Sequence, residues 1–223
     1  MARYTRLEVY QAMYESGLVP LFYNPDVDVS KNVTQAVADG GARVLEFTNR
    51  GDFAFEVFKE LSLSLTAGES SLILGVGSVV DAPTAAMYIG AGANFIVGPI
   101  FNAEIARLCN RRKIAYMPGC GTLNEISKAE ECGVEIVKIF PGSAVGGPGF
   151  IKAVKGPNPW TSIMPTGGVD ATEENIRSWI EAGACCVGMG SKLITKAAVA
   201  AGDYASITEN VKKVLAWIAA ARK

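Results

Sequence analysis

The sequence predicts an α/β fold in which parallel strands alternate with helices, in the form of a single-domain (β/α)8 TIM barrel with an extra N-terminal helix. Three observations favour this class. Eight short apolar runs of strand length are spaced along the 223 residues, helical segments separate them, and no linker or low-complexity tract divides the chain. Such barrels often form one domain at this length, so we expect residues 1–223 to be one unit. A doubly wound open sheet is the alternative, because periodicity does not show whether a sheet closes.

The strand candidates are continuous apolar runs, a pattern typical of parallel strands that are covered on both faces. Several follow a helix that ends in Gly or Gly-Ala, where glycine supplies the left-handed cap that other residues resist. The eight candidates are residues 19–24, 43–48, 72–77, 94–98, 114–118, 135–140, 162–166 and 185–189.

Both ends of the chain are predicted to be helical. A helix before the first strand would place Leu7, Tyr10 and Tyr14 on one apolar stripe. The final helix is predicted at residues 204–221, with its apolar residues on one face.

The charge balance and the lack of histidine exclude several classes of function. Lys and Arg total 21 against 22 Asp and Glu, without a long basic cluster, so we expect no nucleic-acid partner. Because the chain has no histidine, it cannot form a Ser-His-Asp or Cys-His nucleophile system, and it lacks the commonest ligand of catalytic zinc. Acid–base chemistry must use Glu, Asp, Lys, Tyr or Cys, and we expect neither a metal nor a cofactor.

The cysteines and the N-terminal residues indicate a compartment. The five cysteines are an odd number without Cys-x-x-Cys spacing, so they suggest neither a disulfide framework nor a thiolate metal cage. No apolar signal segment is visible at the N-terminus. Residues 82–103 are uncharged and long enough to span a bilayer, but prolines and glycines interrupt them, so we interpret them as helix, turn and buried strand. We expect a soluble cytoplasmic protein with no membrane partner.

Two charged residues interrupt predicted buried strands. Lys138 lies in the middle of an apolar run, where desolvation lowers the pKa of an ammonium group and turns the amine into a nucleophile able to form a Schiff base. Glu46 would point inward near the C-terminal face of a barrel, where its carboxyl group can act as a general acid/base. The spacing alone is equally compatible with a structural role, because each residue could form a buried ion pair, including one with the other.

Further candidates follow the C-terminal ends of strands. Arg50 can bind a carboxylate bidentately, although a loop arginine is more often solvated. Residues 165–168 (Pro-Thr-Gly-Gly) end the seventh strand candidate, and residues 188–191 (Gly-Met-Gly-Ser) end the eighth. Glycines there let backbone N–H groups approach an anion, and these two loops are the recurrent phosphate site of this barrel. Cys120 lacks a histidine to activate it, so we interpret it as a buried or loop thiol.

Six short motifs occur in order along nearly the whole chain: Glu46-Phe-Thr-Asn-Arg50, Gly75-Val-Gly-Ser78, Pro118-Gly-Cys-Gly-Thr122, Lys138-Ile-Phe-Pro141, Pro165-Thr-Gly-Gly168 and Gly190-Ser191. Each motif is short, but the combination is specific. Together they resemble the 2-keto-3-deoxy-6-phosphogluconate (KDPG) / 4-hydroxy-2-oxoglutarate (KHG) aldolase family. That family consists of class I aldolases on a (β/α)8 barrel, typically homotrimers, which release pyruvate without a metal.

Position by position, the resemblance implies roles for ten residues. Lys138 would form the Schiff base, and Glu46 would be the acid/base. The others would bind substrate: Arg50 and Thr166 at the pyruvate carboxylate, Ser78 and Pro99 as pocket lining, and Gly167, Gly168, Gly190 and Ser191 at the phosphate. Two positions depart from the family pattern, because Ser78 stands where Thr is common and Val97-Gly-Pro99 replaces the usual Ser-Pro. These departures affect the fine selectivity of the pocket.

The resemblance implies cleavage of KDPG to pyruvate and glyceraldehyde 3-phosphate, and of 4-hydroxy-2-oxoglutarate to pyruvate and glyoxylate. It also implies a small keto-acid substrate, preferably phosphorylated, a homotrimer, and a role in carbohydrate metabolism through the Entner–Doudoroff pathway. Two alternatives stay open: a phosphosugar isomerase, epimerase or synthase on the same barrel, and a non-catalytic phospholigand-binding barrel. The presence of both Lys138 and Glu46 argues against both.

Overall fold

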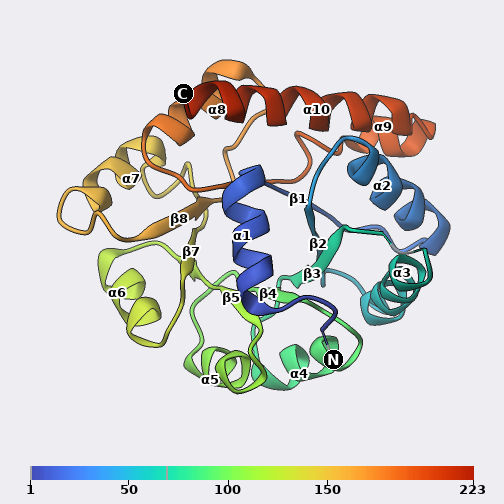
Figure 1. Ribbon diagram of the computed structural model, residues 1–223, viewed down its shortest axis with the longest axis horizontal. Helices are drawn as coiled ribbons and strands as arrows, with labels where there is room; N and C mark the ends of the chain where they lie inside the picture. The colour runs from blue at the N-terminus through green and yellow to red at the C-terminus, as the bar shows by residue number, and fades with distance from the viewer. Residues whose placement is uncertain (1, 69) are drawn as a thin grey trace.

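The computed structural model describes residues 2–68 and 70–223, which form ten helices and nine strands (Figure 1). The strands are β1 (Leu18–Phe22), β2 (Val44–Thr48), β3 (Ile73–Gly77), β4 (Phe95–Val97), β5 (Ala115–Met117), β6 (Gly119–Cys120), β7 (Ile136–Ile139), β8 (Ser162–Pro165) and β9 (Val187–Met189). The helices are α1 (Arg6–Ser16), α2 (Val27–Asp39), α3 (Ala54–Ala67), α4 (Ala82–Gly90), α5 (Ala103–Arg112), α6 (Leu123–Glu131), α7 (Gly147–Lys155), α8 (Glu173–Glu181), α9 (Lys196–Ala201) and α10 (Tyr204–Ala221).

Every predicted apolar run contains a strand, and all the strand pairs are parallel. The strands form a six-stranded sheet in the order β5-β4-β3-β2-β1-β9 and a three-stranded sheet in the order β6-β7-β8. The expected α/β class with a curled parallel sheet is therefore confirmed, but the expected single eight-stranded sheet is not. The sheet is interrupted at Pro118, which separates β5 from β6 and has no N–H to donate to a ladder.

Helices surround the strands on the outside (Figure 1). The final helix α10 matches the predicted residues 204–221 and packs across α2 and α8. Residues 82–103 contain α4, a turn and β4, as predicted. Within the described ranges, no helix combines the length and apolar character needed to cross a bilayer.

Two hydrophobic clusters make up the core. The outer cluster lies between strands and helices and includes Leu45, Phe47, Val137 and Ile139. The inner cluster gathers side chains from strands of both sheets: Val19, Val44, Ile73, Phe95, Val97, Ala115, Met117, Ile136 and Met164, with Cys186 just before β9. The two sheets therefore curl around one shared apolar interior.

Helix α1 closes this interior at the N-terminal ends of the strands, and Figure 1 shows it crossing in front of them. Its buried residues are Val9, Tyr10, Ala12 and Met13. The predicted stripe is correct only for Tyr10, because Leu7 is 77% exposed and Tyr14 is 40% exposed. The helix turns the face between Val9 and Met13 toward the strands. Leu7 points away from them, and Tyr14 lies at the edge of this face, where its hydroxyl donates to Ser162 Oγ of β8 at 2.6 Å.

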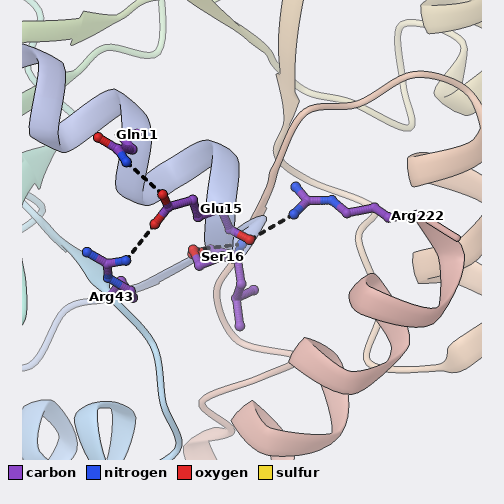
Figure 2. A network of polar contacts seen from close by, with 6 residues as sticks. Gln11, Glu15, Ser16, Arg43 and Arg222 are labelled. Atoms are coloured by element: carbon purple, nitrogen blue, oxygen red, sulfur yellow. Dashed lines mark hydrogen bonds and ion pairs between the residues drawn. The ribbon is translucent and has the colours of Figure 1, made fainter.

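A polar network connects the end of α1 with the C-terminal residues (Figure 2). The Glu15 carboxylate accepts a hydrogen bond from Gln11 Nε2 at 2.8 Å and pairs with Arg43 Nη1 at 2.7 Å. Arg222 donates to the Glu15 carbonyl at 2.9 Å and to the Cys185 carbonyl at 2.5 Å. Exposed ion pairs of this kind contribute little stability by themselves, so the network mainly specifies where the first and last helices meet.

Candidate active site

The alternation of side chains along two strands places Glu46 and Lys138 in the interior. Val44 of β2 belongs to the inner cluster, and Glu46, two residues later, faces the same side. In the same way, Ile136 of β7 belongs to the inner cluster, and Lys138, two residues later, faces the same side. Because β2 and β7 belong to different sheets, the two charged side chains meet across the interior, one pleat beyond the apolar inner cluster.

The two side chains are close together and almost fully buried. Lys138 Nζ lies 4.0 Å from Glu46 Oε1, and the side chains are 5% and 1% exposed. This distance is too long for a hydrogen bond, and Glu46 Oε2 has no hydrogen-bond partner among the residues that the structure describes. Gly77 of the adjacent β3 makes room for the carboxyl group, because a Cβ atom at that position would overlap it.

Burial favours the uncharged form of both groups. It raises the pKa of the Glu46 carboxyl, and the nearby charges of Lys138 and Arg50 oppose this shift only in part. Burial lowers the pKa of the Lys138 ammonium; Glu46 opposes this shift, and the positive charge of Arg50 adds to it. A neutral amine beside a carboxylic acid is a nucleophile with a proton donor at hand, the combination that attack on a carbonyl carbon requires.

Three other polar or aromatic groups lie near the pair. Arg50 Nε donates to Ser78 Oγ at 3.1 Å, which leaves the terminal guanidinium nitrogens available for a carboxylate. The ring centroid of Phe140 lies 5.2 Å from Lys138 Nζ. The hydroxyl of Thr166 is buried and has no hydrogen-bond partner within the described part of the chain.

A cavity of about 820 Å³ lies at the C-terminal ends of the strands. It brings together six of the ten predicted site residues: Arg50, Thr166, Gly167, Gly168, Gly190 and Ser191. Lys138 and Glu46 are buried one pleat below Phe140 and Thr48, which line the cavity. Ser78 reaches it only through its hydrogen bond with Arg50. The structure does not place Pro99 in the cavity wall; its carbonyl lies against Gly119 of β6.

The cavity has lining residues that the sequence reasoning missed: Tyr23, Asn24, Thr48, Phe140, Lys192 and Lys196. Tyr23 and Asn24 follow β1 directly and Thr48 ends β2, so the rule that barrel sites lie at the C-terminal ends of strands would have found them. Lys192 and Lys196 lie in the segment from the end of β9 to the start of α9, and no sequence signal distinguishes them from ordinary surface lysines.

Cys120 takes no part in this arrangement. It is 1% exposed, and burial raises the pKa of its thiol to about 12, so the prediction of a buried or loop thiol is confirmed in its first form. Over residues 2–68 and 70–223, no group of three or more His, Cys, Asp or Glu side chains is arranged to hold a metal ion.

Known proteins resemble the chain over nearly its full length. The family model described as KDPG and KHG aldolase matches residues 9–210. A 2-dehydro-3-deoxy-phosphogluconate aldolase of Pseudoalteromonas atlantica is 33% identical over 217 residues, which cover 94% of this chain and 95% of that protein.

Two solved structures share the fold and about a quarter of the sequence. The KDPG aldolase of Legionella pneumophila, with pyruvate captured at low pH as a covalent carbinolamine intermediate, has a TM-score of 0.83 and 25% identity over 91% of this chain and 96% of that one. The 2-keto-3-deoxy-6-phosphogluconate aldolase of Zymomonas mobilis, determined with 3-phosphoglycerate, has a TM-score of 0.80 and 25% identity over 94% of this chain and 96% of that one.

Two variants that each remove one member of the buried pair are expected to differ in how their free energy of unfolding depends on pH. It should rise with pH in one variant and fall with pH in the other. In Glu46→Gln, Lys138 stays buried but loses the carboxyl group that opposes the effect of burial on its pKa, so this pKa falls further. The folded protein then binds fewer protons than the unfolded chain up to a pH of about 10.4, so the free energy of unfolding rises with pH. In Lys138→Met, the pKa of Glu46 rises further, the folded protein binds more protons above a pH of about 4.3, and the free energy of unfolding falls with rising pH.

Urea unfolding of both variants and the parent, over a pH series from about 5 to 9, measures these slopes, each at most about 1.4 kcal/mol per pH unit for one proton. Slopes of the same sign in the two variants, or slopes equal to that of the parent, would contradict the opposite shifts that burial gives the pKa values of the two groups.

Proposed function

Because the chain belongs to the family of KDPG and KHG aldolases, we propose that it is a class I aldolase that cleaves KDPG to pyruvate and glyceraldehyde 3-phosphate, with 4-hydroxy-2-oxoglutarate as a second substrate. The observation that carries the proposal is the buried pair of Lys138 and Glu46, 4.0 Å apart. The covalent carbinolamine in the Legionella enzyme supports it. A phosphosugar isomerase or an idle phospholigand-binding barrel has no need of such a pair, so both alternatives are disfavoured.

The first stage joins the substrate to Lys138. The neutral amine attacks the C2 ketone of the keto acid while Glu46, as the carboxylic acid, protonates the C2 oxygen, which gives a carbinolamine. Glu46 takes a proton from the nitrogen and passes it to the C2 hydroxyl, and this oxygen leaves as water. The product is a protonated imine, with Glu46 now a carboxylate.

The second stage breaks the carbon–carbon bond. The Glu46 carboxylate removes the proton of the C4 hydroxyl, the C3–C4 bond breaks, and its electron pair moves to the protonated imine to leave an enamine and a free aldehyde. Glu46, directly or through a water, returns that proton to C3. Water then adds at C2, and hydrolysis releases pyruvate and restores the amine. The protonated imine accepts the electrons that a metal ion stabilises in metal-dependent aldolases.

The remaining residues would bind the two ends of the substrate. Arg50 and the free hydroxyl of Thr166 would hold the carboxylate next to C2, with Ser78 fixing Arg50. The phosphate would lie at the other end of the cavity, against the two glycine clusters: Gly167, Gly168, Gly190 and Ser191. Pro99 lies outside the cavity wall and takes no part in this proposal.

The same proposal includes the architecture and setting of the protein. We infer that residues 1–223 form one domain and that its two sheets make one closed (β/α)8 barrel. Two observations support closure: β6 follows β5 after the single residue Pro118, and a parallel bridge between Thr166 and Gly188 connects the ends of β8 and β9. A homotrimer, a cytoplasmic location and a role in the Entner–Doudoroff pathway complete the proposal on the strength of family membership alone.

Borohydride treatment in the presence of pyruvate is expected to add a reduced pyruvyl group to Lys138, because reduction converts the imine to a stable secondary amine. Peptide mass spectrometry identifies the labelled lysine. Lys138→Arg should take no label and show no turnover, since a guanidinium stays protonated. Labelling confined to exposed lysines such as Lys152, or no labelling, would contradict the mechanism. A loss of turnover in EDTA that a divalent metal restores would also contradict it.

Ser191→Asp is expected to impair cleavage of KDPG while sparing the reaction with pyruvate. The new carboxylate would lie beside the phosphate, and like charges in a partly desolvated cleft should lower kcat/KM by about tenfold or more. Pyruvate occupies the other end of the cavity, so its borohydride labelling should keep the parental concentration dependence. Ser191→Asn is the neutral control of equal size. Equal losses for both ligands, or none for KDPG, would contradict the phosphate assignment.

A further inference from the structure

The position of Arg50 poses a physical problem. Its side chain is exposed and follows the end of β2, and a free arginine side chain loses about 2 kcal/mol of conformational entropy when it is immobilised. Bidentate binding of a carboxylate requires a fixed guanidinium plane. The hydrogen bond to Ser78 restrains Nε at one point, so the backbone that carries Arg50 must also be held in place.

The residue directly before Arg50 is anchored on both its backbone and its side chain. The N–H of Asn49 donates to the Gly77 carbonyl of β3 at 2.8 Å. Its side-chain oxygen Oδ1 accepts a hydrogen bond from the Tyr88 hydroxyl at 2.9 Å. Tyr88 belongs to α4, so this bond connects the end of β2 to a helix on the outside of the sheet.

Tyr88 is itself rigidly placed. It is fully buried, and its ring meets those of Phe55 and Phe58 edge-on, with centroids 5.4 Å and 5.0 Å away. Burial raises the pKa of its phenol to about 12, so the hydroxyl stays protonated and remains a donor at physiological pH. A phenol packed edge-on against two aromatic rings gives Asn49 a well-fixed partner.

The residue directly after Arg50 lies against a second tyrosine. Gly51 lies so close to the Tyr23 hydroxyl that a Cβ atom at this position would overlap it. Tyr23 follows β1 and lines the cavity, and its ring packs on Phe47 with the centroids 5.7 Å apart. Arg50 therefore lies between one neighbour that is hydrogen-bonded to a tyrosine and one that packs against a tyrosine.

We propose that Tyr88 and Asn49 are positioning residues that hold Arg50 ready to receive the carboxylate of the keto acid. Neither residue lines the cavity, so each acts through the backbone of Arg50 and has no contact with the reacting atoms. The inference rests on the proposed function, because it takes a keto acid bound covalently to Lys138 as the ligand whose carboxylate meets Arg50. A hydrogen bond donated by a residue of the outer helix layer would thus help Arg50 to bind the carboxylate.

The test measures how much pyruvate is needed for half-maximal borohydride labelling of Lys138. The variants are Tyr88→Phe, Asn49→Ala and the double variant. Methyl pyruvate, the neutral ester of the same ketone, is the second probe, because it reaches Lys138 without presenting a carboxylate. Tyr10→Phe is the matched control: Tyr10 is a buried tyrosine whose hydroxyl also has a protein hydrogen bond, from the Tyr116 N–H at 3.3 Å, but it lies at the opposite end of the interior.

Tyr88→Phe and Asn49→Ala should each raise the half-maximal concentration of pyruvate by about three- to tenfold, the effect of losing roughly one hydrogen bond. The double variant should be no worse than either single variant, because both remove the same bond. Tyr10→Phe should lower the melting temperature to a similar extent without changing the labelling.

Three results would overturn the inference: an unchanged pyruvate requirement in both single variants, an equal change for methyl pyruvate, or the same change in Tyr10→Phe. An unlabelled Lys138 in the parent protein is a different result, because it would refute the proposed Schiff-base chemistry and the positioning role together. Asn49→Ala keeps the test decisive if Tyr88→Phe fails to fold, since position 49 is only partly buried.

Discussion

The chemistry of this protein depends on the desolvation of two ionisable groups that share one apolar interior. Separate burial of an ammonium and a carboxylate costs several kcal/mol each, and their mutual attraction offsets this only when the geometry is good and further hydrogen bonds are made. Here the nearest atoms of Lys138 and Glu46 are 4.0 Å apart, and Glu46 Oε2 has no partner among the described residues. Burial therefore shifts both groups toward their uncharged forms, which are the forms that the first step of the proposed reaction uses.

The fold provides this environment in layers. Helix α1 and the inner cluster exclude water from one end of the strands, while the cavity opens at the other end, where loops carry Arg50 and the glycine clusters. Gly77 leaves the space that the Glu46 carboxyl occupies. Strands therefore supply the buried pair, and loops supply the groups that we propose bind the substrate.

Much of this arrangement could be predicted from the sequence, and the exceptions have physical reasons. Apolar runs predicted every described strand except the two-residue β6 (Gly119–Cys120), and a charge inside such a run drew attention to Lys138 and Glu46. Periodicity did not predict the break at Pro118, because ladder pairing depends on a distant strand. It misplaced Leu7, because the face of a helix that becomes buried depends on what packs against it. The bond between Tyr88 and Asn49 joins residues 39 positions apart, so no local pattern reveals it.

The charge state of Lys138 is the most direct test of the account. An NMR titration of protein labelled with carbon-13 at the lysine ε-carbon follows each amine separately, and the Lys138→Arg variant identifies one resonance by its absence. We expect that resonance to titrate well below the ordinary lysine value of about 10.4, and to move lower still in Glu46→Gln. A midpoint at or above the ordinary value would show that Lys138 is held as an ammonium ion, and would contradict a site made reactive by desolvation.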